Sequence, residues 1–226
     1  MTWSSWIRTV EVEPSLYAAD FLRLGEQIEI LLRCGARIFH FDVGDGHFVE
    51  PVTIGPVVLE SIAPIIHREG GVIDCHLMVD EPTNYFGPLQ SAGADSVTFH
   101  YEATSGDPRT LAAAARECGF QVGIAFKPET SVDDVVAFAD AFDLVLCMSI
   151  HPGYSGQAFM PEALERLARL RAMLPAHVHV QVDGGISNDN IRSVHEAGAD
   201  LIVCGTAIFG MEDLPRAYRR LVQLLA

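Results

Sequence analysis

The sequence predicts an α/β fold, a single (β/α)8 TIM barrel that spans residues 1–226. Short runs of β-branched and apolar residues alternate with longer helical patterns along the whole chain, which is typical of parallel βαβ units. There are eight such runs, and 226 residues suit a barrel, which needs roughly 200 to 250. No linker or low-complexity tract divides the chain, so we expect one domain.

The expected strands follow one another at intervals that leave room for a helix between them. In chain order they are residues 10–16, 37–43, 71–78, 96–102, 121–126, 144–150, 177–183 and 201–205. Apolar residues at i, i+3 and i+4 spacing predict helices that include 21–34, 111–118, 132–141, 163–174 and 214–225. A glycine follows a helical pattern at Gly35, Gly93, Gly119 and Gly198, where we expect the left-handed residue that ends a helix.

Composition excludes several classes of function. Hydrophobic residues make up 49% of the chain and charged residues 20%, so a chain of this length can bury a large core. The formal charge of −15 repels nucleic acid and anionic membranes, so we expect neither as a partner. Five single cysteines without CxxC spacing indicate free thiols, and no apolar run is long enough to cross a membrane. We therefore expect a cytoplasmic protein.

The ends of three predicted strands carry side chains that can bind a metal ion. The second strand ends with His40 and Asp42, which the two-residue period of a strand places on one face. His76 lies near the end of the third strand and Asp183 ends the seventh. In a barrel these strand ends meet at the mouth. Two imidazoles and two carboxylates suit Zn, Fe, Mn or Co.

Each of these residues also has a structural interpretation. A single histidine such as His40 or His76 is more often a hydrogen-bonded core residue than a ligand. Carboxylates inside a barrel are harder to explain without a cation, because an unpaired buried charge is costly. The four residues together therefore predict a metal site more strongly than any one alone. His100 and Glu102, after the fourth strand, are candidates for a supporting or structural role.

Three glycine-containing segments are candidates for binding a phosphate group. They are residues 151–157, 183–187 and 205–207, which follow the last three strands. Loops in this position of a barrel commonly bind phosphate through backbone N–H groups, and an acidic protein needs such a site. Taken one by one, each segment is also compatible with an ordinary turn.

Six ordered stretches of this sequence resemble the ribulose-phosphate 3-epimerase family. They are Pro14-Ser15-Leu16 with Ala19-Asp20-Phe21, His40 to Val49, His76-Leu77-Met78, Met148 with Pro152 to Gln157, Val182 to Ile186, and Gly205 to Phe209. The resemblance covers nearly the whole chain. It implies a barrel of the ribulose-phosphate-binding type that holds one divalent metal ion (Zn, Fe, Mn or Co), a homo-oligomer, and a role in the pentose phosphate pathway.

The resemblance also implies the reaction and the residues that carry it out. The metal ligands would be His40, Asp42, His76 and Asp183, and Asp42 and Asp183 would also move the proton at C3 of a ketose phosphate through an enediolate. D-ribulose 5-phosphate and D-xylulose 5-phosphate would interconvert. The implied substrate contacts are Ser15, His76, Met78, Met148, Gly153, Tyr154, Ser155, Gly156, Gly184, Gly185, Gly205 and Thr206.

Departures from the family pattern leave the substrate open. Gly44 stands where the family usually has a methionine, and we expect the missing side chain to leave space for a different substrate or for water. His151, Ser155 and Glu50 also depart from the usual residues. Allulose 6-phosphate or a tetrulose phosphate is therefore an alternative substrate.

Two other classes of function compete with this interpretation. A Schiff-base aldolase would have to use Lys127, the single lysine of the chain. A barrel that binds a sugar phosphate without catalysis is the other alternative, and the presence of all four expected ligands disfavours it.

Overall fold

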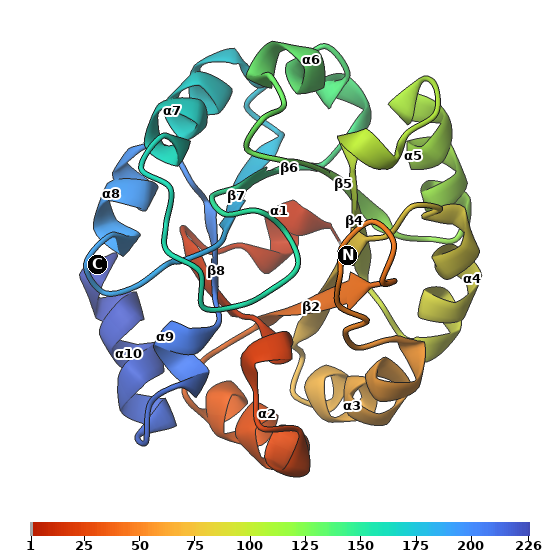
Figure 1. The fold of residues 1–226 in the computed structure, drawn as a ribbon. Helices are drawn as coiled ribbons and strands as arrows, with labels where there is room; N and C mark the ends of the chain where they lie inside the picture. The colour runs from red at the N-terminus through yellow and green to blue at the C-terminus, as the bar shows by residue number, and fades with distance from the viewer. Residues whose placement is uncertain (1) are drawn as a thin grey trace.

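The protein is a barrel of eight parallel strands surrounded by helices, described by a computed structural model for residues 2–226 (Figure 1). The strands are β1 Glu11–Pro14, β2 Ile38–Gly44, β3 Val72–Met78, β4 Ser96–His100, β5 Gln121–Phe126, β6 Leu144–Met148, β7 His179–Asp183 and β8 Leu201–Cys204. Each lies within, or within one residue of, an expected run. The predicted fold class is confirmed, and the barrel forms a single domain.

Helices follow the strands and cover the outside of the barrel. They are α2 Leu24–Arg33, α3 Pro56–Arg68, α4 Thr83–Ala92, α5 Pro108–Glu117, α6 Val132–Val136, α7 Ala163–Met173, α8 Ile191–Glu196, α9 Thr206–Phe209 and α10 Leu214–Leu224. The helix expected over 132–141 is interrupted, because after α6 the chain turns to bury Ala139 and Phe142. The four glycines expected to end helices all have positive φ, between 89° and 114°.

The ring of strands is nearly closed, and it closes at residues that matter for the site. The hydrogen-bonded order runs β1, β8, β7, β6, β5, β4, β3, β2. Between β1 and β2 there is one isolated parallel bridge, which pairs Ser15 with His40. The last link of the barrel therefore places the end of β1 directly beside the residues of β2 that face the interior.

A short helix that the sequence patterns did not predict seals the other end of the barrel. In α1 (Trp3–Trp6) the two indoles pack edge to face, 4.9 Å between ring centroids. They share a buried cluster with Ile38, Val72 and Leu201, which lie at the starts of their strands. Figure 1 shows α1 behind the ring of strands. With that end filled by apolar side chains, the barrel interior opens to ligands at the carboxyl ends of the strands.

No helix within residues 2–226 is long and apolar enough to cross a membrane.

Candidate active site

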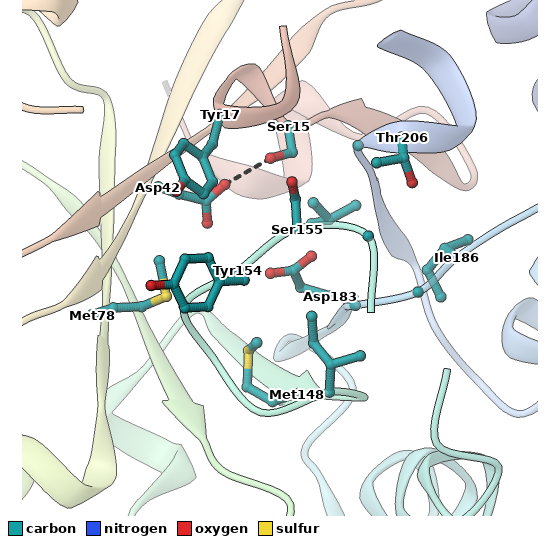
Figure 2. Close-up of a pocket in the computed structure, with 17 residues that line it drawn as sticks. Ser15, Tyr17, Asp42, Met78, Met148, Tyr154, Ser155, Asp183, Ile186 and Thr206 are labelled. Atoms are coloured by element: carbon teal, nitrogen blue, oxygen red, sulfur yellow. Dashed lines mark hydrogen bonds between the residues drawn. The ribbon is translucent and has the colours of Figure 1, made fainter. Parts of the chain in front are cut away.

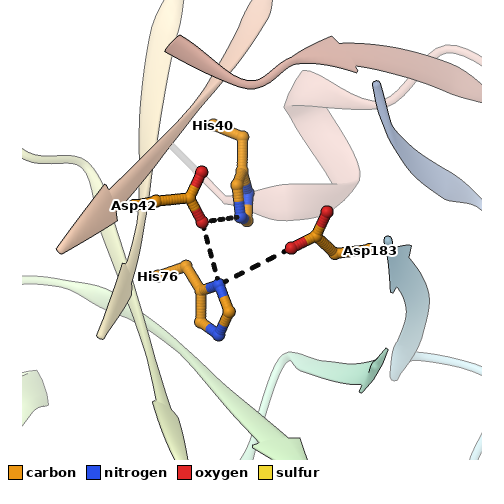
Figure 3. A group of neighbouring side chains, drawn as sticks. All are labelled: His40, Asp42, His76 and Asp183. Carbon is orange, nitrogen blue, oxygen red and sulfur yellow. Dashed lines mark hydrogen bonds and ion pairs between the residues drawn. The ribbon is translucent and has the colours of Figure 1, made fainter. Parts of the chain in front are cut away.

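Strand β2 directs its polar residues inward because its side chains alternate between two faces. Phe39 and Phe41 pack outward in the main core with the helices, whereas His40 and Asp42 face the barrel interior. Asp42 lies opposite His76 in the register of β2 and β3. Asp183 completes the group from the end of β7, so that three strands supply the four side chains in Figure 3.

The four side chains converge on one small volume. Asp42 Oδ1 lies 3.2 Å from His40 Nε2 and 3.1 Å from His76 Nδ1, and Asp183 Oδ2 lies 3.9 Å from His76 Nδ1. One ligand atom from each residue lies within 4.8 Å of the others, so the buried cluster can hold a metal ion. His40 Nε2 is buried and makes no hydrogen bond within residues 2–226, as expected for a nitrogen that presents its lone pair to a cation.

Burial and close contact shift the ionisation of the two aspartates in opposite directions. Burial raises the pKa of Asp42, but the neighbouring His40 and His76 more than reverse this, so its pKa lies below the ordinary value. For Asp183, burial and the Asp42 carboxylate both raise the pKa, to about 6. Burial also opposes charge on His40, yet contact with Asp42 and Asp74 leaves its pKa well above the ordinary value. One carboxylate is thus firmly ionised and the other readily takes up a proton.

Both histidines are oriented by buried polar side chains behind them. His40 Nδ1 lies 3.2 Å from Asp74 Oδ2, and Gln181 Nε2 donates to the same oxygen at 2.8 Å and to Glu13 Oε2 at 2.6 Å. Burial and the Asp74 carboxylate raise the pKa of Glu13 well above its ordinary value, so this carboxyl is neutral. Asp74, Gln181 and Glu13 together fix the orientation of the His40 ring.

His76 has a different support. Its Nε2 lies 2.9 Å from Nε2 of His100, whose Nδ1 is 3.1 Å from Glu102 Oε2. The backbone N–H of Lys127 and the hydroxyl of Thr130 donate to the other oxygen of Glu102. His100 and Glu102 therefore lie where the sequence allowed a supporting role, behind the cluster.

A cavity opens above the cluster at the mouth of the barrel (Figure 2). Its lining includes Asp42, Asp183 and the predicted substrate contacts Ser15, Met78, Met148, Gly153, Tyr154, Ser155, Gly156, Gly184, Gly185, Gly205 and Thr206. His76, the remaining predicted contact, lies beneath it in the cluster. Ser15 donates a hydrogen bond to Asp42 Oδ2 at 2.7 Å, so the end of β1 also fixes this carboxylate.

Other lining residues were not predicted from the sequence. They are Tyr17, Ile150, Ile186 and Val203. Tyr17 follows Ser15 in a turn of 3-10 helix, Leu16–Ala18, and its nearness to the end of β1 was the available signal. The three aliphatic residues follow or end barrel strands, where pattern alone does not distinguish lining from core.

Glycines shape the side of the cavity between β6, β7 and β8. Gly184 and Gly185 have φ of 121° and 64°, which side-chain-bearing residues rarely adopt. A Cβ on Gly184 would lie 2.4 Å from Ile150 Cγ1, and one on Gly185 would lie 2.4 Å from the backbone N of Phe159. The Gly185 N–H donates to no acceptor within residues 2–226. Within residues 2–226 no lysine or arginine lines the cavity, so backbone N–H groups and the hydroxyls of Ser155 and Thr206 are the donors available to an anion here.

The expectation that Gly44 leaves space is wrong. A Cβ at this position would lie 2.9 Å from the backbone oxygen of Pro51 and 3.0 Å from Val49 Cγ2. The chain after β2 folds back here, since Thr53 Oγ1 donates to the Asp42 carbonyl and accepts from the Gly44 N–H, both at 2.6 Å. Gly44 therefore accommodates this returning segment and gives no evidence for a different substrate.

Most of the other departures also lie outside the cavity. His151 is exposed and pairs with Glu129 at 3.1 Å on the rim, and neither it nor Glu50 lines the cavity, whereas Ser155 does. Lys127 stacks its ammonium over the Phe48 ring at 3.8 Å from the centroid and does not line the cavity either. A Schiff base on Lys127 is therefore not supported.

The fold and the site define a TIM-barrel enzyme with a buried His/Asp cluster at its mouth. The model of the ribulose-phosphate 3 epimerase family matches residues 11–209, and the chain belongs to this family. It is thus an epimerase, an isomerase that acts on carbohydrates, as the resemblance predicted.

Curated members of the family are similar to this protein over most of the chain. A ribulose-phosphate 3-epimerase of Schizosaccharomyces pombe is 41% identical over 199 residues, which cover 88% of this chain and 86% of the relative. One from Mycobacterium tuberculosis is 40% identical over 205 residues, with 89% and 87% covered. Ribulose-phosphate 3-epimerase 2 of Cupriavidus necator is 38% identical over 226 residues, with 96% and 92% covered.

Solved structures with low sequence identity share the fold. The 3-hexulose-6-phosphate synthase from Salmonella typhimurium has a TM-score of 0.74 at 17% identity, and 96% of this chain and 98% of that chain are covered. KGPDC from Streptococcus mutans has a TM-score of 0.72 at 13% identity, with 96% of this chain and 98% of that chain covered.

Proposed function

We propose that this protein interconverts D-ribulose 5-phosphate and D-xylulose 5-phosphate by moving the proton at C3, with one divalent metal ion bound. The observation that carries the proposal is that two carboxylates from different strands meet in one cluster with two histidines. Asp42 and Asp183 reach the same cluster from β2 and β7. Epimerisation requires one group to take a proton from C3 and another to return one from the opposite face, which suits such a pair.

The residues that would hold the metal are His40, Asp42, His76 and Asp183. Their nitrogen and oxygen donors suit Zn, Fe, Mn or Co. When bound, the ion supplies the positive charge that polarises the ketone and stabilises negative charge on the substrate oxygens. The hydrogen bonds from Ser15 to Asp42 and between His40 and Asp74 support this donor set, because they restrain the Asp42 carboxylate and the His40 ring before a ligand enters.

Proton transfer is assigned to the two aspartates. In one direction Asp42 would remove the C3 proton, and Asp183 would return a proton to the other face. In the reverse direction the two residues exchange roles. Met78 and Met148, which are buried and line the cavity, cover the planar intermediate with apolar surface and exclude water.

The phosphate of the substrate is assigned to the glycine-lined side of the cavity. Gly184, Gly185, Gly205 and Gly156 present backbone there with no side chain in the way. Neutral backbone donors suit a protein with a formal charge of −15, since they act locally. From the family resemblance alone, we extend the proposal to a cytoplasmic homo-oligomer in the pentose phosphate pathway.

The proposal is tested by following product formation with purified protein reloaded with Zn, Mn, Fe or Co. We expect D-xylulose 5-phosphate to form from D-ribulose 5-phosphate, and the chelated protein to be inactive. A panel of four- and six-carbon ketose phosphates serves as the comparison. Faster turnover of a tetrulose phosphate or of allulose 6-phosphate would move the substrate, and sugar-phosphate binding without turnover with any metal would indicate a non-catalytic barrel.

A further inference from the structure

Tyr17 projects over the mouth of the cavity from the turn that follows β1. In this 3-10 turn, Leu16–Ala18, Leu16 is fully buried in the core, whereas Tyr17 is partly exposed and lines the cavity. Figure 2 shows Tyr17 beside Asp42, together with Met78 and Tyr154, on the side of the cavity opposite Thr206 and Ile186. The ring thus lies across the cavity from Thr206 and Ile186.

The hydroxyl of Tyr17 is available to a ligand. It makes no hydrogen bond within residues 2–226, whereas the neighbouring Ser15 hydroxyl is already committed to Asp42. Burial, Tyr154 and the Asp42 carboxylate raise the pKa of Tyr17, so the phenol keeps its proton at neutral pH. Tyr17 therefore offers an O–H donor into the cavity.

Side-chain hydroxyls line more than one side of this cavity. The lining includes the side-chain hydroxyls Ser15, Tyr17, Tyr154, Ser155 and Thr206 and no lysine or arginine. Thr206 belongs to the side assigned to the phosphate, and Tyr17 to the side next to the metal cluster. A substrate with its phosphate on the glycine side, its C2 and C3 at the cluster and C4 between them extends toward Tyr17 with its free end, C1.

We propose that Tyr17 is a specificity-determining residue whose phenol donates a hydrogen bond to the C1 hydroxyl of the ketose phosphate. This inference rests on the proposed function, since it uses the same placement of phosphate and reacting carbons. Tyr17 contacts the C1 end of the substrate, which carries neither the phosphate nor the transferred proton. It thereby favours ketoses with a terminal hydroxymethyl group over analogues that end in a methyl group.

The test is a double-mutant-type cycle that removes the Tyr17 hydroxyl, the C1 hydroxyl of the substrate, or both. Wild type and Tyr17→Phe, both reloaded with the same metal, are compared on D-xylulose 5-phosphate and on 1-deoxy-D-xylulose 5-phosphate, with deuterium entry at C3 followed by NMR. For each protein we compare kcat/KM on the two substrates. We expect the fall from the natural to the deoxy substrate to be about 3- to 10-fold larger in wild type than in Tyr17→Phe, which is the range of one neutral hydrogen bond. For Tyr17→Phe on the natural substrate, the same loss should fall mainly on KM.

Tyr218→Phe is the matched control, because Tyr218 lines a separate cleft with Arg8 and Glu11. This variant should show the same difference in kcat/KM between the two substrates as wild type. If kcat/KM falls equally on the 1-deoxy substrate in wild type and in Tyr17→Phe, the assignment of Tyr17 is overturned, even in a fully active epimerase. Absence of C3 exchange in wild type on every ketose phosphate is a different result, which refutes the proposed function itself. The two failures are therefore distinguishable.

Discussion

Replacing Asp183 with asparagine is expected to stabilise the metal-free protein at neutral pH while removing activity. Burial and the Asp42 carboxylate raise the pKa of Asp183 from 3.8 to about 6, and its side chain is only 18% exposed. At 1.36 kcal/mol per pKa unit, ionised Asp183 costs the folded state about 3 kcal/mol. Asp183 makes no side-chain hydrogen bond within residues 2–226 that asparagine would lose; its single polar contact is the His76 pair at 3.9 Å.

The sign of this effect follows from the direction of the pKa change. Because the folded pKa lies above the unfolded one, the contribution of Asp183 to stability is fully present below pH about 4 and is lost as pH rises through about 6. Urea unfolding with a chelator should therefore show Asp183→Asn more stable than wild type by about 3 kcal/mol at pH 7.5 and nearly equal to it at pH 4.

Asp189→Asn, an exposed change of the same charge on the same loop, is the control and should have little effect at either pH. Equal stability of Asp183→Asn and wild type at pH 7.5, or a difference that does not vary with pH, would show that ionised Asp183 does not destabilise the folded state.

Three further outcomes are expected. The affinity for Co(II), measured by the absorption of the bound ion, should rise from pH 5 to 7. The pKa values of Asp183 and His40 are both raised, so protons on these residues compete with the ion at the lower pH. An affinity that does not change with pH would contradict this. Gly44→Ala should lower the free energy of unfolding by about 1–3 kcal/mol, since its Cβ would lie 2.9 Å from the Pro51 oxygen, and unchanged thermal stability would show that the returning segment moves freely. Trp6→Ala should cost about 3–5 kcal/mol in urea unfolding, and a cost below about 1 would mean that α1 does not seal the barrel.

The fold could be predicted because each strand carries its own local signal. The eight strand cores are short runs of β-branched and apolar residues, and the glycines after helices mark where each unit ends. The boundaries were less accurate, because they depend on tertiary contacts. The first strand ends at Pro14 rather than at residue 16, since Ser15 forms the bridge that closes the ring and Leu16 begins a turn.

The candidate site could be predicted as far as strand ends determine it. His40, Asp42, His76 and Asp183 were expected to meet because parallel strands of a barrel place their carboxyl ends together, and the structure brings the four within 4.8 Å. The pairing of Asp74 with His40 joins two different strands, and the contact of residues 49–53 with Gly44 depends on how the irregular segment after β2 folds back. No periodicity encodes such contacts, which is why the expectation about Gly44 failed.

If Asp42 and Asp183 move the C3 proton on opposite faces, solvent hydrogen enters C3 during turnover. D-ribulose 5-phosphate is converted in D2O by the metal-loaded protein, and the C3 deuterium content of product and residual substrate is followed by NMR from the first turnovers. We expect D-xylulose 5-phosphate deuterated at C3, early residual substrate still protonated, and loss of both exchange and conversion in Asp42→Asn and Asp183→Asn. Product that keeps the original hydrogen at C3, or conversion that survives in either variant, would contradict this assignment.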